Sequence, residues 1–286
     1  MLVIVGALIV ITGVVGGYVI HGGKLGILWQ PTELIIIGGA ALGSLIIASP
    51  ISVIKDIIKQ VMGTLTGKDI SKGDFTELLL LLYELTKTAK GNPLAIEPHV
   101  ENPEGSEIFK KYPGVLKNHH AIHFICDTLK VQISSPMSPY DLEDLMDADI
   151  KTAHDEEFKA SAAVNKVGDA MPGLGIVAAV LGVVITMGKL TEGKEVIGHS
   201  VAAALIGTFI GVLASYGFLG PLSGKMESKI NEEGKYMDVI KAALLGYAKD
   251  ASPKVCVEMA RRVVPPHVRP SFEEIDKATS GVKAAA

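Results

Sequence analysis

Hydrophobic residues along this chain gather in four long blocks. The blocks cover residues 1–20, 34–54, 170–188 and 200–224, and none contains Asp, Glu, Lys or Arg. About 20 apolar residues in an α-helix cross a bilayer core of about 30 Å. Lipid offers no hydrogen-bond partners to the backbone, so helix is the expected structure of such a block. The pattern therefore predicts four transmembrane helices.

We expect these spans to hold no ionisable side chain apart from Tyr18 and Tyr216. An intramembrane carboxylate or histidine is the usual carrier of an ion. If the protein moves ions, a second chain must therefore supply the carboxylate. The Gly, Ala, Ser and Thr residues of the blocks suit the close packing of such a partner helix.

The polar segments predict further helices. Asp74 and Glu77 read as a capping box for a leucine-rich helix that ends near Pro93. We expect another helix over residues 119–134, and a longer one from Pro139 straight into the third block. The expected fold is an all-α membrane protein in four parts: transmembrane helices 1 and 2 (1–54), a cytoplasmic helical loop (55–168), transmembrane helices 3 and 4 lining an ion pathway (169–224), and a cytoplasmic helical tail (225–286).

The distribution of basic residues predicts the orientation. The two short connections between blocks carry only Lys24, Lys189 and Lys194, and all other Lys and Arg lie in the long loop and the tail. Basic residues favour the cytoplasmic side of a membrane, so both termini are expected there. The formal net charge of −4 argues against nucleic acid as a partner.

Several polar positions are candidates for chemistry, each with a plainer alternative. Thr186 and Thr208 could line a pore, or could bond to the carbonyl four residues earlier in the helix. Pro172 and Pro221 could act as hinges, or could only mark kinks. Three histidines share one predicted helix but lack a clear third metal ligand: His119, His120 and His123. We expect no catalytic residue, no metal and no cofactor.

The order and spacing of several motifs resemble the MotA family of flagellar stator subunits. The resemblance covers almost the whole chain. Its motifs are GGYVIHGGKLGILWQPTELIIIGGA near the start, VENPEGSEIFKKYP in the loop, GDAMPGLGIVAAVLGVV and IGTFIGVLASYGFLGPL in the last two spans, and RPSFEEID in the tail.

The resemblance implies partners. By this resemblance, copies of the chain form a ring, expected to be a pentamer. The ring surrounds a MotB-like single-span protein whose membrane Asp carries the ion. The ring sits in the bacterial inner membrane, contacts membrane lipid, and pushes on the rotor protein FliG. By motif match the two rotor-contacting charges are Lys90 and Glu97, with Lys87 as the alternative basic residue.

The resemblance also implies pathway residues. The two family prolines match Pro172 and Pro221, and the pore threonine matches Thr208, to which Thr186 and Tyr216 are added as polar groups of the spans. Sodium-type relatives carry a Gly-Thr pair in the third span. This chain has alanine at 178 and at 179, so Ala179 indicates protons. The implied function is a non-enzymatic, proton-driven stator subunit. Two alternatives are an energiser of the ExbB/TolQ type, which has three spans, and a membrane scaffold without ion flux.

Overall fold

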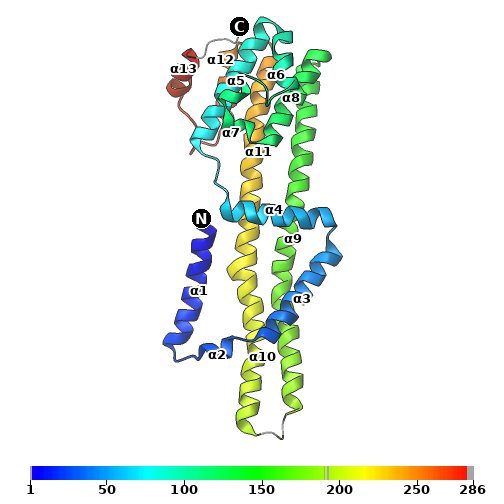
Figure 1. Cartoon of the computed structure of the whole chain (residues 1–286), viewed down its shortest axis with the longest axis vertical. Helices are drawn as coiled ribbons and strands as arrows, with labels where there is room; N and C mark the ends of the chain where they lie inside the picture. The colour runs from blue at the N-terminus through cyan, green and yellow to red at the C-terminus, as the bar shows by residue number, and fades with distance from the viewer. Residues whose placement is uncertain (1, 190, 192, 282–286) are drawn as a thin grey trace. The chain divides into compact units, whose positions relative to one another are not determined.

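The protein is described by a computed structural model over residues 2–189, 191 and 193–281 (Figure 1). All elements within these ranges are helical. They are α1 Leu2–Ile20, α2 Leu25–Leu28, α3 Pro31–Ala48, α4 Ile51–Thr66, α5 Lys72–Gly91, η1 Pro93–Ile96, α6 Glu97–Glu101, η2 Phe109–Lys111, α7 Pro113–Leu116, α8 His119–Ser134, α9 Pro139–Met187, α10 Lys194–Ala214, η3 Ser215–Leu219, α11 Gly220–Ala248, α12 Pro253–Val263 and α13 Phe272–Ser280.

The chain divides into two compact units. We call the first the apolar unit, formed by residues 1–67 and 156–229, and the second the charged unit, formed by residues 68–155 and 230–286.

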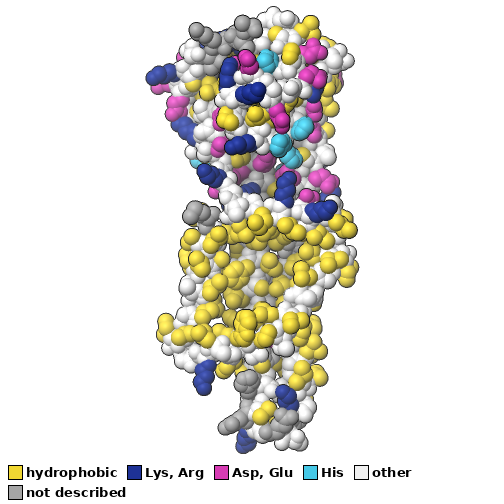
Figure 2. All heavy atoms as spheres, in the orientation of Figure 1, with side chains coloured by type: hydrophobic (Ala, Val, Ile, Leu, Met, Phe, Trp, Pro, Cys, Tyr) yellow, Lys and Arg dark blue, Asp and Glu magenta, His cyan; other side chains and the backbone are white. Residues whose placement is uncertain are grey.

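Helices of the apolar unit turn large hydrophobic side chains outward. Ile20, Ile47 and Leu205 are all exposed, and hydrophobic side chains cover most of the unit's visible surface (Figure 2). Such a surface needs lipid or another apolar partner. Four helical stretches are long and apolar enough to span a membrane: Leu2–Ile20, Leu25–Ala48, and parts of Pro139–Met187 and Val196–Ala248. The prediction of an all-α membrane protein with four spans is confirmed.

The second span differs from its prediction in one important residue. It includes Glu33, which lies in the first turn of α3 and is buried. The sequence block begins at Leu34, where the uninterrupted apolar run begins, but the helix begins at Pro31. The expectation that the spans hold no ionisable group apart from tyrosines is therefore wrong at Glu33.

The charged unit is built around α5. Leu78, Leu79, Leu81 and Leu82 are all fully buried, so this helix contacts neighbours on most of its faces, including α12, α13, α7 and η1. Both cysteines, Cys126 and Cys256, are reduced and buried in this unit. Burial raises the pKa of the Cys126 thiol to about 12.

The cap of α5 also differs from its prediction. Ser71 is the N-cap residue, and it forms a capping box with Asp74. Glu77 lies one turn further along and instead accepts a hydrogen bond from the Gly114 amide at 2.6 Å. The predicted capping box, Asp74 with Glu77, is therefore wrong: the observed box, Ser71 with Asp74, lies about one turn earlier in the chain.

The longest helix runs as predicted, from Pro139 into the third apolar block. α9 is continuous from Pro139 to Met187. The path from α10 to α11 is helical throughout but changes to a π-turn, η3, over Ser215–Leu219. Pro221 follows directly. Proline has no N–H, and its ring clashes with the carbonyl four residues earlier, here that of Gly217. A wider turn before the proline accommodates this conflict.

Candidate functional site

A seam of small residues joins α9 to α10 in the apolar unit. A methyl group built on Gly211 would lie 2.5 Å from the Met171 carbonyl oxygen and 2.9 Å from Cα of Gly175. A methyl group on Gly182 would lie 2.8 Å from Cβ of Ala204. Only glycine permits backbones to approach this closely, and small residues serve this purpose between membrane helices. The backbones of α9 and α10 therefore pack directly against each other along this seam.

Two pathway candidates lie along this seam. The backbone amide of Ala179 is 3.1 Å from a methyl group built on Gly207. The Cα of Thr208 is 3.2 Å from a methyl group built on Gly175. The Thr208 side chain is half-buried and its hydroxyl makes no hydrogen bond within the described residues. This hydroxyl therefore retains its capacity to bond to water or to another chain.

Thr186 behaves differently from Thr208. It is buried, and its hydroxyl donates to the Gly182 carbonyl at 2.8 Å. Its hydrogen is thus used inside the helix, in the way that is common for threonine in membrane helices. Thr186 can therefore act on a pathway only as a hydrogen-bond acceptor, through the lone pairs of its hydroxyl oxygen.

The remaining span candidates lie at local breaks in helix geometry. Pro172 is inside α9 and donates no hydrogen bond to the carbonyl four residues before it. Pro221 is exposed and follows the π-turn, and Tyr216 within that turn is 74% exposed. Alpha-helices with π-turns or internal prolines bend more readily than regular ones. α1 contacts this turn, since a methyl group on Gly217 would lie 3.1 Å from Cγ1 of Val10.

Glu33 is a functional candidate that the pattern of apolar blocks did not reveal, because its block begins at Leu34. Glu33 is 6% exposed, and its Oε2 atom is buried without a hydrogen-bond partner in the described residues. It lies close to Gly207 of α10, whose methyl group, if built, would lie 2.8 Å from Glu33 Oε2 and 3.1 Å from the Ala179 amide nitrogen. Its position within the stretch QPTELIII, directly before a long apolar run, gave a signal, because a carboxyl group is costly to bury in a membrane.

The charged unit holds the two candidate rotor contacts in contrasting environments. The Lys90 ammonium donates to the carbonyl oxygens of Asp250 (2.9 Å) and Ala251 (3.2 Å), and lies 3.5 Å from the Asp250 carboxylate. Glu97 is exposed and makes no ion pair or hydrogen bond from its side chain within the described residues. The alternative basic residue, Lys87, lies over the ring of Tyr83 at 5.6 Å from its centroid.

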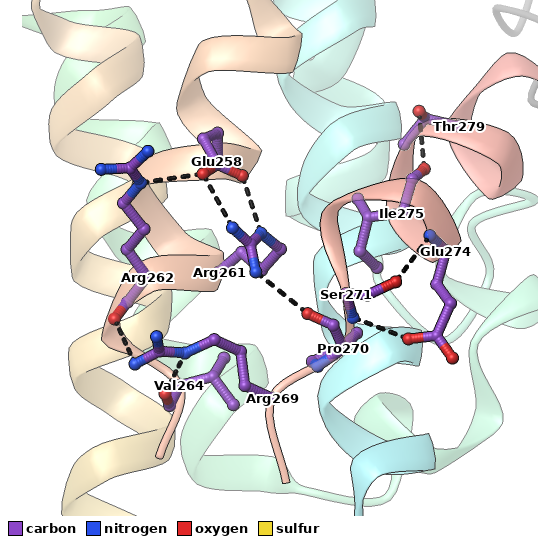
Figure 3. Close-up of polar contacts among 10 residues, drawn as sticks. All are labelled: Glu258, Arg261, Arg262, Val264, Arg269, Pro270, Ser271, Glu274, Ile275 and Thr279. Carbon is purple, nitrogen blue, oxygen red and sulfur yellow. Dashed lines mark hydrogen bonds and ion pairs between the residues drawn. The ribbon is translucent and has the colours of Figure 1, made fainter. Parts of the chain in front are cut away.

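A polar network orders the C-terminal segment of the same unit (Figure 3). The Arg261 guanidinium donates twice to the Glu258 carboxylate, at 2.7 and 2.9 Å, and once to the Pro270 carbonyl at 3.1 Å. Arg262 donates to Glu258 at 2.8 Å. These hydrogen bonds, first that from Arg261, lower the pKa of Glu258 to about 2. The network holds the start of α13 against α12.

Other polar groups of the charged unit are structural. The Glu84 carboxylate is fully buried and is paired with Lys111 and with the Tyr112 hydroxyl. Burial, together with this carboxylate, raises the pKa of Tyr112. The three histidines of α8 line a cavity of about 320 Å³. Within the described residues, no group of three or more His, Cys, Asp or Glu could hold a metal ion.

Comparison with protein families gives two matches. Residues 4–93 match the family described as Motility protein A N-terminal. Residues 117–239 match the MotA/TolQ/ExbB proton channel family. Together these matches cover more than half of the chain.

Individual relatives agree along the full length. The chain is 37% identical over 284 residues to Motility protein A of Escherichia coli K12, covering 99% of this chain and 96% of the relative. It is 37% identical over 273 residues to chemotaxis protein LafT of Vibrio parahaemolyticus, covering 95% and 96%.

Solved structures share the fold. The flagellar MotAB stator complex from Bacillus subtilis matches with a TM-score of 0.75 at 20% identity, covering 94% of this chain and 98% of that one. A structure of MotAB from C. jejuni matches with a TM-score of 0.76 at 17% identity, covering 92% and 95%.

Proposed function

Because this chain belongs to the MotA/TolQ/ExbB proton channel family and is a stator subunit of flagellar motility, we propose that its α9–α10 pair forms one wall of a proton path completed by a carboxylate from a single-span partner. The observation that carries this is the small-residue seam. It lies in spans 170–188 and 200–224, which contain no Asp, Glu, Lys or Arg. A wall of this kind shapes a path but needs a group that binds the ion.

The proposed partner resembles MotB, which the titles of the MotAB structures name beside MotA. Its span carries an Asp, and several copies of the present chain, five by resemblance, form a ring around it. The large exposed apolar surface of the apolar unit supports this assembly, because part of it is available to neighbouring copies and part to lipid.

We assign protons as the ion because alanine, not threonine, occupies position 179. Sodium prefers several oxygen ligands, and Ala179 offers no side-chain oxygen. Thr208 keeps a free hydroxyl for water, while Pro172 and Pro221, with Tyr216 in the π-turn, supply local flexibility as the carboxylate changes charge. In this proposal Thr186 is a buried oxygen at one end of the seam.

The proposed placement follows the parts expected from sequence. Residues 1–54 and 169–224 lie in the bacterial inner membrane. Residues 55–168 and 225–286 lie in the cytoplasm with both termini, and they generate torque without enzymatic chemistry. Glu97, exposed and unpaired, is the stronger of the two contacts with the rotor protein FliG. The Lys90 ammonium is already hydrogen-bonded to the carbonyls of Asp250 and Ala251, which follow α11.

The energiser alternative is not favoured. The match to Motility protein A N-terminal covers residues 4–93, a range that contains the second span and all of the first except its first two residues. Four candidate spans also exceed the three of ExbB/TolQ-type subunits.

The test is purification of the complex from its native membrane, reconstitution into vesicles, and measurement of proton entry with an enclosed pH-sensitive dye. We expect a co-purifying single-span subunit with one membrane Asp. Replacing that Asp with Asn should abolish proton entry. A complex that lacks such a subunit, or one whose flux ignores the substitution, would contradict the proposal.

A further inference from the structure

Glu33 stands apart from the other buried polar groups of this chain. Three described side chains have a buried polar atom with no hydrogen-bond partner: Glu33, Gln60 and Thr88. Of these only Glu33 is ionisable. It is also the only Asp, Glu, Lys or Arg within the second candidate span, Leu25–Ala48.

The surroundings of Glu33 are apolar and close. A methyl group built on Gly207 would lie 2.8 Å from Glu33 Oε2, 3.1 Å from Ala178 Cβ and 3.1 Å from the Ala179 amide nitrogen. The space that a side chain at 207 would fill is thus adjacent to the carboxyl group. Ile37, one turn further along α3, is buried with Ala178 in the same small cluster. Glu33 therefore reaches from α3 to the point where α10 meets α9.

A stabilising role at the start of α3 does not account for this position. An acidic residue in the first turn interacts well with the helix dipole, and that effect is available to an exposed side chain. Burial of Oε2 without a hydrogen-bond donor penalises the charged form of the carboxyl group. The arrangement is tolerable if the group is neutral for part of the time, which means that it binds a proton.

We propose that Glu33 is a second proton-binding carboxyl of the pathway, contributed by this chain and additional to the carboxylate of the partner. The carboxylate takes a proton from a hydronium ion, which leaves water and a neutral carboxylic acid. The acid later returns the proton to water on the path. Gly207 has no side chain, so α10 can approach the Glu33 carboxyl closely, and a methyl group there would lie only 2.8 Å from Oε2. This inference rests on the proposed function, because it needs a proton path along the α9–α10 seam.

The proposal is tested in dye-loaded vesicles that contain the complex with its single-span subunit. Glu33→Gln keeps the size of the side chain but cannot release a proton, so proton entry should fall by at least about tenfold. Glu33→Asp should retain a measurable part of the flux, because the acid remains but is withdrawn by one methylene. Gly207→Ala should also lower the flux, because its methyl group would lie 2.8 Å from Oε2 and would push the carboxyl group out of its position.

Two controls are matched to these variants. Glu104→Gln removes an exposed carboxyl of the charged unit, and Gly38→Ala adds a methyl group where nothing lies within 4 Å. Both should conduct like the unsubstituted complex. The amount of purified complex is measured for each variant, so that assembly and conduction are separated.

The outcomes distinguish this inference from the proposed function. Unchanged flux in Glu33→Gln, with flux still abolished by the partner's Asp-to-Asn change, would overturn the role of Glu33 alone. Loss of assembled complex in Glu33→Gln but not in Glu33→Asp would make Glu33 a structural residue and would also overturn it. Absence of flux in the unsubstituted complex would remove the proposed function and this inference together.

Discussion

Lys90 and Glu97 carry opposite charges, and their surroundings give them different roles. The Lys90 ammonium reaches the carbonyls of Asp250 and Ala251 at the end of α11. Both carbonyls lie beyond Ala248, the last residue of α11, so the lysine satisfies backbone acceptors of the turn that follows this helix. Glu97 has no such bond to any residue that the structure describes. Its charge is therefore available to another protein without the loss of any contact within this chain.

Charge reversal at Glu97 separates rotor contact from stability. Glu97→Lys should strongly reduce swimming, while the melting temperature of the purified complex stays the same, because exposed unpaired residues contribute within about 0.5 kcal/mol. Swimming in soft agar and thermal unfolding are the two measurements. Swimming at the normal rate would contradict a role for Glu97 at the rotor. Lys90→Ala provides the contrast, since it should lower both swimming and stability.

Glu258 makes the stability of the C-terminal segment depend on pH. Its folded-state pKa is lowered to about 2 from an ordinary value of 4.5, chiefly by the hydrogen bond from Arg261. A lowered pKa means that the stabilisation is complete above pH 4.5 and is lost as the pH falls towards 2.

The corresponding variant is Glu258→Gln. It should be less stable than the parent at neutral pH, and the difference should shrink as the pH falls from 4.5 towards 2. Thermal unfolding of the purified complex at several pH values measures this. A difference that is constant across that range would show that the Arg261 and Arg262 bonds contribute nothing to stability.

At the scale of elements, the close contact between α9 and α10 depends on glycines such as Gly211, which have no side chain. Gly211→Ala would place a methyl group 2.5 Å from the Met171 carbonyl. The two helices would have to separate, at a cost of about 1–3 kcal/mol. Gly173→Ala is the control, because nothing lies within 4 Å of its methyl group. Melting of the complex in detergent should show a lower midpoint for Gly211→Ala alone, and equal midpoints would contradict the close seam.

Helix ends that carry local signals were predictable from sequence. α8 was expected over residues 119–134, and α9 was expected to begin at Pro139; both were found there. Proline and cap residues act within one turn, so their effect is visible in a short stretch. The cap of α5 was misplaced because Ser71, Asp74 and Glu77 lie at equal intervals, and either pair satisfies the same pattern.

Features that depend on distant residues were not predictable in this way. The burial of Glu33 depends on the missing side chain at Gly207, which belongs to another helix. Lys90 was selected by resemblance as a rotor contact, but its bonds to Asp250 and Ala251 depend on how α11 ends beside α5. The π-turn before Pro221 was also missed, since proline in a helix can produce a kink, an end or a wider turn.

At the scale of the whole molecule, the identity of the conducted ion determines whether a proton gradient or a sodium gradient powers swimming. With Ala179 in place of a threonine, a protonophore should stop swimming, and replacement of sodium by potassium should leave swimming speed unchanged. Tracking of single cells in both media measures this. A requirement for sodium would overturn the assignment of protons while leaving the family membership intact.

The burial of both cysteines has a practical consequence for mapping this protein in a membrane. Cys126 is 3% exposed and Cys256 is 0% exposed, and a thiol that is buried and protonated reacts slowly with maleimides. We therefore expect neither native cysteine to react appreciably with a maleimide in the folded protein. One added cysteine, for example Lys24→Cys or Lys249→Cys, would report which side of the bilayer its segment faces, without first removing any native residue.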